Sequence, residues 1–125
     1  MTARRKSDAR KVADAVKSFA LGLPGAWEDT PWESDHVAKV GKKVFVFMGD
    51  PASTDPGIAV KLPDSHAQAL SLDCAKPSGY GLGKAGWVNI QLTGPDRPSA
   101  DVLCDWVEES YRAIAPKKLI AELDA

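Results

Sequence analysis

The spacing of hydrophobic residues predicts helices at both ends of the chain. Near the start, apolar positions recur at intervals of four, three and four residues, as expected for one face of a helix. These positions are Val12, Val16, Phe19 and Leu23. Ser7 is a suitable N-cap for this helix, and the glycine- and proline-containing stretch 22–25 is expected to end it. Near the other end, Ser99 can cap a second amphipathic helix, and Pro116 can begin a final helical turn.

Between these helices the hydrophobic residues alternate with polar ones, which predicts β-strands. The expected strands are Ala26–Trp32, His36–Val40, Lys43–Met48, Gly57–Leu62 and Trp87–Leu92. Pro31 confines the first strand to a sheet edge, because proline cannot donate a ladder hydrogen bond. Gly41-Lys42 predicts a two-residue hairpin turn of type II′, because glycine adopts a positive φ without steric cost.

The order of these elements predicts one two-layer α+β domain over residues 1–125. A short helix from Pro63 to Leu72 and an extended piece within 76–83 complete the pattern. The order is α-β(3)-α-β(2)-α, with Ala26–Trp32 as an additional edge strand. Short connections favour an antiparallel sheet with the helices on one face. We expect residues 1–6 to be flexible.

The pattern Gly81-x-Gly83-x-x-Gly86 superficially matches a nucleotide-binding loop. Such a loop follows a strand and begins a helix, whose N-terminus binds the phosphates. Here Pro77 and Ser78 precede the pattern, and a strand follows it. The glycines are therefore predicted to shape a hairpin, and no nucleotide cofactor is expected.

Composition and charge limit the function classes. The chain has 125 residues with a formal net charge of −1, so it has no general attraction for polyanions. Residues 1–17 carry a local excess of basic side chains, which is either a solvated helix face or a basic arm. The N-terminus does not resemble a secretory signal, and no apolar run is long enough to span a membrane. Two separated cysteines, Cys74 and Cys104, suggest a reducing compartment, and we expect a cytoplasmic protein.

Catalytic and metal-binding patterns are weak. His36 and His66 are the only histidines, and neither has a second ligand at a suitable spacing. An acidic cluster fits either a solvated sheet edge or a site for a hard cation, although its spacing matches no calcium loop. Its members are Glu28, Asp29, Glu33 and Asp35. The serines lack the surroundings of a catalytic nucleophile. We predict no catalytic residue, no metal and no cofactor.

A binding surface is better supported than an active centre. Trp87, Asn89 and Gln91 share one face of the last strand, and Tyr80, Lys84 and Lys61 are expected nearby. Aromatic, amide and cationic groups together can stack on bases and hold phosphates. The alternative is that a helix covers Trp87 and that Lys84 is simply solvated.

Several short segments, in this order and spacing, resemble the MmcQ/YjbR family of small bacterial proteins over nearly the whole chain. They are Leu23-Pro24-Gly25, Lys39–Phe45, Ile58–Leu62, Tyr80-x-Leu82-x-Lys84-x-x-Trp87 and Ser110-Tyr111. The resemblance implies a two-layer α-β(3)-α-β(2)-α fold. It also implies DNA binding through two hairpins, since members of the family are often described as DNA-binding.

On this chain the implied hairpins turn at Gly41-Lys42 and within Gly81–Gly86. Lys42, Lys43 and Lys84 would approach phosphates, and Trp87 would support them or stack on a base. The near-neutral charge differs from the basic footprint of a duplex-binding protein, so weak binding is expected. The predicted function is therefore a non-enzymatic module that binds DNA weakly. The predicted binding residues are Lys42, Lys43, Lys61, Tyr80, Lys84 and Trp87.

Two alternatives remain open. The first is a protein-interaction, adaptor or homodimerisation domain without nucleic-acid binding, built on an exposed patch around the doubly apolar strand Val44–Met48. The second is an enzyme that acts on a small molecule in a cleft beside Lys61, Tyr80 and Trp87.

Overall fold

A computed structural model describes residues 2–32, 34–79 and 81–125 of the chain. The helices are α1 (Thr2–Leu21), α2 (His66–Leu70), α3 (Ala100–Ile114) and α4 (Lys117–Asp124). The strands are β1 (Ala26–Trp32), β2 (Asp35–Val40), β3 (Lys43–Gly49), β4 (Gly57–Lys61), β5 (Ala75–Pro77) and β6 (Trp87–Gln91). A short 3₁₀ helix, η1 (Leu82–Ala85), lies between β5 and β6.

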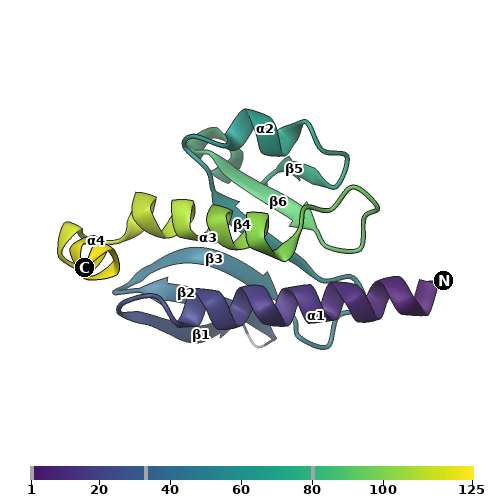
Figure 1. Cartoon of the computed structure of the whole chain (residues 1–125), viewed down its shortest axis with the longest axis horizontal. Coiled ribbons are helices and arrows are strands. Elements are labelled where there is room, and N and C mark those ends of the chain that lie inside the picture. Colours follow the sequence, from purple (N-terminus) through teal and green to yellow (C-terminus); the bar gives the residue numbers. More distant parts are fainter. Residues whose placement is uncertain (1, 33, 80) are drawn as a thin grey trace.

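The strands form one antiparallel sheet in the order β1-β2-β3-β4-β6-β5. Helices α1 and α3 lie side by side on one face of this sheet (Figure 1). The predicted two-layer α+β fold is therefore confirmed. β1 occupies the edge position that Pro31 led us to expect, so four strands precede α2.

The main core lies between the sheet and the two long helices. Val46 and Val60 pair across β3 and β4, and both are completely buried in this core. A register shift in the β2–β3 pairing leaves Phe45 without a direct partner and buries it as well. Its ring meets Tyr111 of α3 edge to face, with the ring centroids 5.3 Å apart. The bulge thus allows two successive residues of β3 to enter one core.

Adjacent residues of α3 fasten this helix to the rest of the fold. The buried hydroxyl of Ser110 donates to the Phe45 carbonyl and accepts a 2.9 Å hydrogen bond from the Lys61 amide. The Tyr111 hydroxyl donates to the Pro24 carbonyl, 2.6 Å away, in the turn after α1. These bonds satisfy backbone groups that would otherwise be buried without partners.

Helix boundaries differ from expectation at two places. α1 begins at Thr2, so Ser7 lies inside the helix and the prediction that it is the N-cap is wrong. The residues before Ser7 include Ala3, Arg4 and Arg5, which favour helix and extend it backwards. α2 covers less than the predicted stretch 63–72, because the residues before it form a turn held by α3.

That turn is held by a single carboxylate. Glu109 of α3 accepts hydrogen bonds from the amides of Asp64 and Ser65, at 2.9 Å and 3.0 Å. It also accepts one from the Ser65 hydroxyl at 2.7 Å. The other helix predictions agree: Ser99 caps α3 by accepting from the Val102 amide, and α4 follows Pro116.

Both predicted hairpins are present. Val40 pairs with Lys43 across a two-residue turn in which Gly41 has φ +62°. In the second hairpin, Gly81 and Gly86 flank η1 with φ values of +80° and +95°. β6 begins directly after Gly86, so these glycines connect two strands and do not begin an α-helix. Within the described residues, no helix combines the length and the apolarity that a membrane crossing requires.

Candidate functional site

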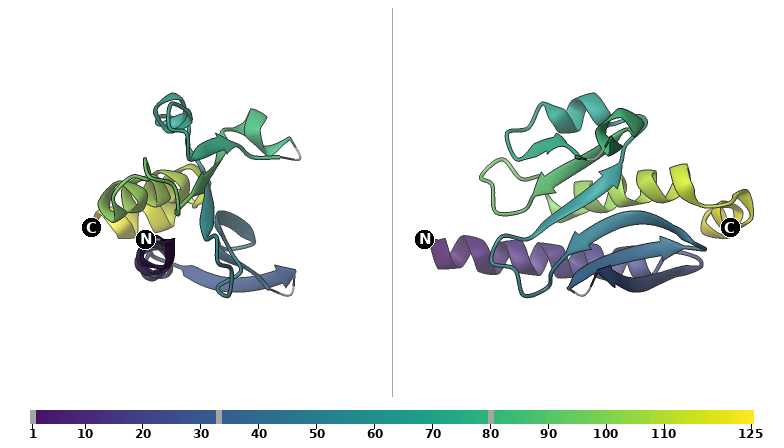
Figure 2. Two further views of the ribbon diagram at one scale, coloured as in Figure 1. Left: turned by 90° about the vertical axis from the view of Figure 1, so that its right-hand side faces the viewer. Right: turned by 180° about the vertical axis from the view of Figure 1, so that it is seen from behind.

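In the part of the chain that the structure describes, no α-helix covers the face of the sheet opposite α1 and α3 (Figure 2). Seen along the sheet, β1 and β2 on one side and the β5–β6 connection on the other project away from the helices (Figure 2, left). The strand register identifies the side chains on this side, which we call the open face. They include Trp27, Val37, Lys39, Phe47, Ala59, Lys61, Lys76, Trp87, Asn89 and Gln91.

The predicted lysines gather at one end of the sheet but do not all share the open face. Lys61 pairs with Trp87 and lies on it, and Lys84 lies in η1. Lys42 is exposed in the β2–β3 turn. Lys43 is also exposed, but its pairing with the core residue Val40 places its side chain on the helix side of the sheet.

One lysine of the open face was missed by the sequence reasoning. Lys76 pairs with Asn89 and is exposed, whereas the sequence suggested only an irregular extended piece in this region. We group Lys61 and Lys76, which lie on the open face, with Lys42 and Lys84, which lie in the connections that border the sheet, and call these four the open-face lysines. Among residues 2–32, 34–79 and 81–125, none of these four forms an ion pair with a carboxylate. Lys39 differs, because its amine lies 2.6 Å from Asp29.

Trp87 is a supporting residue. Its side chain is only 6% exposed, and its ring meets Phe47 edge to face at a centroid distance of 5.3 Å. The prediction that Trp87 stacks on a base is therefore wrong, because the ring is not accessible. On the open face, the ring packs against Phe47 of β3, and β4 lies between their two strands.

Trp27 is an accessible ring that the sequence reasoning did not single out. It is 45% exposed, and its indole nitrogen donates a 3.0 Å hydrogen bond to the Gly41 carbonyl. The Lys39 amine lies 5.4 Å from the ring centroid. The bond to Gly41 holds the ring next to the turn that carries Lys42. The available signal was the alternation of the edge strand, which places Trp27 opposite Lys39.

Two other predicted features need comment. The prediction of an exposed apolar patch around Val44–Met48 is wrong, because Phe45 and Val46 are buried under α3 and Phe47 packs against Trp87. Tyr80 lies outside the described residues, so the structure says nothing of its place.

A hollow of about 490 Å³ opens on the far part of the open face. Small residues create it, because Gly57 and Ala59 present almost no side chain at the positions next to β6. Phe47 and Lys76 contribute to its lining, together with the amides of Asn89 and Gln91. Lys61 and Trp87 do not line this hollow, and Tyr80, the third residue of the predicted cleft, lies outside the described residues.

Hydrogen bonds fix both amides of the hollow. Ser78 donates to the Asn89 side-chain oxygen at 2.7 Å, and the Gln91 side-chain nitrogen donates to Asp55 at 2.5 Å. Thr93 donates to the other oxygen of Asp55 at 2.7 Å, which holds that carboxylate in place. Within the described chain, these bonds leave the Asn89 side-chain nitrogen and the Gln91 side-chain oxygen free to meet a ligand.

The thiols are unsuited to nucleophilic chemistry. Cys74 borders the hollow, but burial raises its pKa to about 11, with a further contribution from Asp96. Burial also raises the pKa of Cys104. Both cysteines are free thiols. Because the thiolate is the reactive form, both side chains act as small apolar groups.

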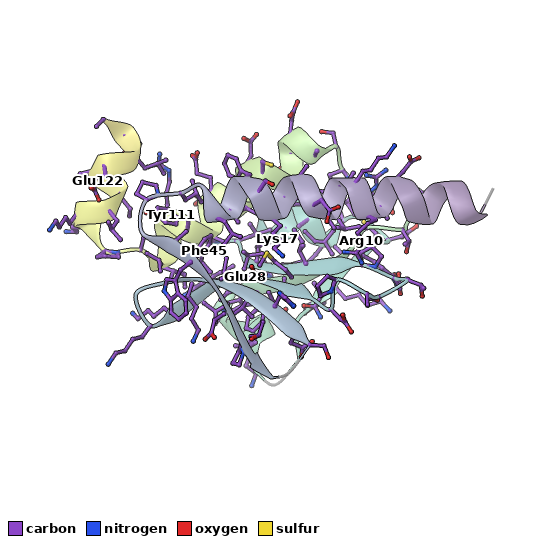
Figure 3. All side chains as sticks on the ribbon, turned by 90° about the horizontal axis from the view of Figure 1, so that it is seen from below. Arg10, Lys17, Glu28, Phe45, Tyr111 and Glu122 are labelled. Carbon is purple, nitrogen blue, oxygen red and sulfur yellow. The ribbon has the colours of Figure 1, made fainter. Side chains whose placement is uncertain are left out.

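Two members of the predicted acidic cluster, Glu28 and Asp29, are held in ion pairs. Glu28 lies 2.8 Å from the Lys17 amine and 2.5 Å from the His36 ring nitrogen, which joins α1 to β1 and β2 (Figure 3). The hydrogen bond from Lys17, followed by that from His36, lowers the pKa of Glu28. The pKa of Asp29 is lowered by its bond to Lys39. Glu33 lies outside the described residues, and those that are described contain no cluster of three metal-ligating side chains.

These features define a class of small two-layer α+β domain with an uncovered, lysine-bearing sheet face. Residues 21–113 match the YjbR family model, and the chain belongs to the YjbR family. The resemblance found in the sequence is thus confirmed. The matched range contains the whole sheet, whereas nearly all of α1 and the whole of α4 lie outside it. No curated protein matches the chain.

Proposed function

We propose that this protein is a non-enzymatic cytoplasmic module that binds nucleic acid through its open face. The observation that carries the proposal is the set of open-face lysines, which no described carboxylate neutralises. Three of them, Lys42, Lys61 and Lys84, come from separate segments at the same end of the sheet. Such an arrangement favours a ligand with several spaced negative charges, as in a phosphate backbone.

The distribution of charge on the open face supports this reading. Lys61 and Lys84 lie where β4 ends and β6 begins, whereas Asp55 and Asp73 lie at the opposite ends of these strands, near Gln91. A phosphate backbone is therefore attracted to the lysine end and repelled from the other. A net charge of −1 makes this attraction local, which fits weak, salt-sensitive binding.

Trp27 adds an aromatic contact to the lysine end. Its exposed ring is held beside the β2–β3 turn, and bases of any sequence can stack on such a surface. Phosphate contacts and stacking carry little sequence information, so we expect low sequence preference.

The direct test is the affinity for labelled DNA and RNA by fluorescence anisotropy at low salt, followed by a salt titration. The proposal predicts that the logarithm of the association constant falls linearly with the logarithm of salt concentration, because binding releases counterions. Folded protein at high concentration that binds neither DNA nor RNA at low salt would overturn it.

A protein-interaction or homodimerisation domain is the second candidate. One observation favours it: β1 is an edge strand that carries Trp27, an exposed large hydrophobic residue. An edge strand with an aromatic side chain can pair with a strand from a second molecule. Light scattering over a range of protein concentrations tests this candidate, and a monomer throughout would count against homodimerisation.

A further inference from the structure

We propose that the hollow of the open face holds one unpaired base, so that the protein prefers single-stranded over double-stranded nucleic acid. This inference rests on the proposed function and specifies the form of its ligand. It follows from the shape of the hollow, the chemistry of its lining and its position relative to the lysines.

The shape suits a flat ring. The hollow has a volume of about 490 Å³ and lies where Gly57 and Ala59 leave room between the side chains of β3 and β6. Phe47 borders this space, and the packing of its ring against Trp87 holds it in place. A rigid aromatic border next to small residues favours a planar aromatic ligand.

The polar groups suit the edge of a base. Asn89 offers a side-chain nitrogen as donor, and Gln91, two residues along the same strand, offers a side-chain oxygen as acceptor. Ser78 and Asp55 hold these amides in fixed orientations. Unpaired bases present neighbouring donors and acceptors on their hydrogen-bonding edges, whereas paired bases already use them.

The position suits one nucleotide of a bound strand. Along β6, Trp87 beside Lys61 lies two residues from Asn89, a distance of about 6.6 Å on an extended strand. Lys76 pairs with Asn89 from the other side. A phosphate can therefore stay at Lys61 and Lys76 while its base enters the hollow. The hollow also has Asp73 on its border, which disfavours a phosphate there but tolerates an uncharged base.

A duplex cannot make the same contact without unpairing. The hollow is lined by residues of β3, β4, β5 and β6. Bases in a duplex are stacked and paired inside the double helix. A duplex can bind the lysines, but it leaves the hollow empty. The expected consequence is a preference for single strands at equal charge.

The experiment compares three labelled probes of equal length at one salt concentration. They are a single strand, the same strand with abasic sites, and its duplex. The single strand is expected to bind about tenfold more tightly than the abasic strand, the loss expected for one base contact. Equal affinity for these two strands would overturn the inference while leaving the proposed function intact. Absence of binding to all three probes would overturn both.

Two variants locate the effect. Ala59→Leu fills the hollow without a change in charge, and Asn89→Ala removes the proposed donor from an exposed position. Each should lower the ratio of single-strand to abasic affinity below that of the native protein and leave the part that comes from stacking on Trp27. Ala113→Leu, on an exposed position of α3, is the matched control and should keep the ratio of the native protein. If Ala59→Leu fails to fold, Asn89→Ala decides, and an unchanged ratio in that variant overturns the inference.

Discussion

Phe47 of β3 and Trp87 of β6 meet edge to face, with ring centroids 5.3 Å apart, although β4 lies between their strands. The contact is possible because Ala59 of β4, directly beside Phe47, is too small to separate the rings. This pair divides the open face into a lysine end and a hollow. It also explains why a tryptophan that the sequence suggested as a ligand contact is a structural residue.

Removal of two open-face lysines should weaken nucleic-acid binding and its salt dependence together. Lys61→Ala combined with Lys84→Ala removes two phosphate contacts, so the log–log salt slope should become shallower by about 1.4 to 1.8. Lys117→Ala with Lys118→Ala removes the same charge from exposed positions of α4 and serves as the control. Anisotropy titrations at several salt concentrations measure both slopes. Equal slopes in the two double variants would contradict a local phosphate site.

Lys42 and Lys43 provide a comparison between sequence neighbours. Lys42 lies in the turn next to Trp27, whereas Lys43 leaves the sheet on the helix side. Lys42→Ala should therefore lower the affinity for DNA several-fold, and Lys43→Ala should lower it less. Both changes remove one exposed charge, so the difference between them depends only on where the side chain lies. The same titrations test this order. A larger loss of affinity for Lys43→Ala would contradict binding on the open face, because it would place the ligand towards the helix side of the sheet.

Replacement of the accessible ring should affect binding more than folding. Trp27→Ala removes a side chain that is 45% exposed, and the loss of stacking on one base is about 1 to 3 kcal/mol of binding free energy. Trp27→Phe keeps an aromatic face and loses only the bond to Gly41, so it should retain most of the affinity. Affinities are compared with the free energies of unfolding from urea titrations. A Trp27→Ala variant that unfolds easily but binds normally would argue against stacking.

Replacement of Trp87 should affect folding first. The side chain is 6% exposed, so Trp87→Ala should lower the free energy of unfolding by about 3 to 5 kcal/mol. Trp87→Phe keeps part of the contact with Phe47 and should cost less. Urea denaturation followed by far-UV circular dichroism measures the change. Nearly unaltered stability of Trp87→Ala would contradict the supporting role.

Acid should weaken the attachment of α1 to the sheet through Glu28. Its pKa is lowered in the folded protein by Lys17 and then by His36, so the stabilisation exists above its ordinary pKa of 4.5. It is lost as the pH falls from 4.5 through the lowered value. Glu28→Gln should therefore be less stable than the native protein at pH 7, and this difference should shrink at pH 3. Urea midpoints at the two pH values measure it, and a difference that grows on acidification would contradict the assignment.

Local sequence patterns were sufficient to predict most of the secondary structure. The spacing of Val12, Val16 and Phe19 predicted α1, and Ser99 was identified as a cap from its place before an amphipathic stretch. The glycines at 81, 83 and 86 were assigned to a hairpin because a strand follows them, which the structure confirms. These signals depend on neighbours in the sequence, which is why they can be read without coordinates.

The candidate site could be predicted only in part, because it depends on which face each strand turns to the helices. Lys61 was correctly placed on the strand beside Trp87, but a register shift and a two-residue turn put Lys43 on the other side of the sheet from Lys61. Trp27 and Lys76 joined the site through pairings between distant segments. No local pattern records such pairings.

The sequence by itself determined the fold class, the antiparallel hairpins and the family, because hydrophobic periodicity and turn residues act over a few neighbouring positions. Only the tertiary structure decided which aromatic ring is accessible, which lysines face the same side and where the sheet is hollow. The physical reason is that exposure depends on packing between remote strands. Trp87 is buried because Phe47 reaches it over Ala59, while Trp27 stays open at an edge where no further strand packs.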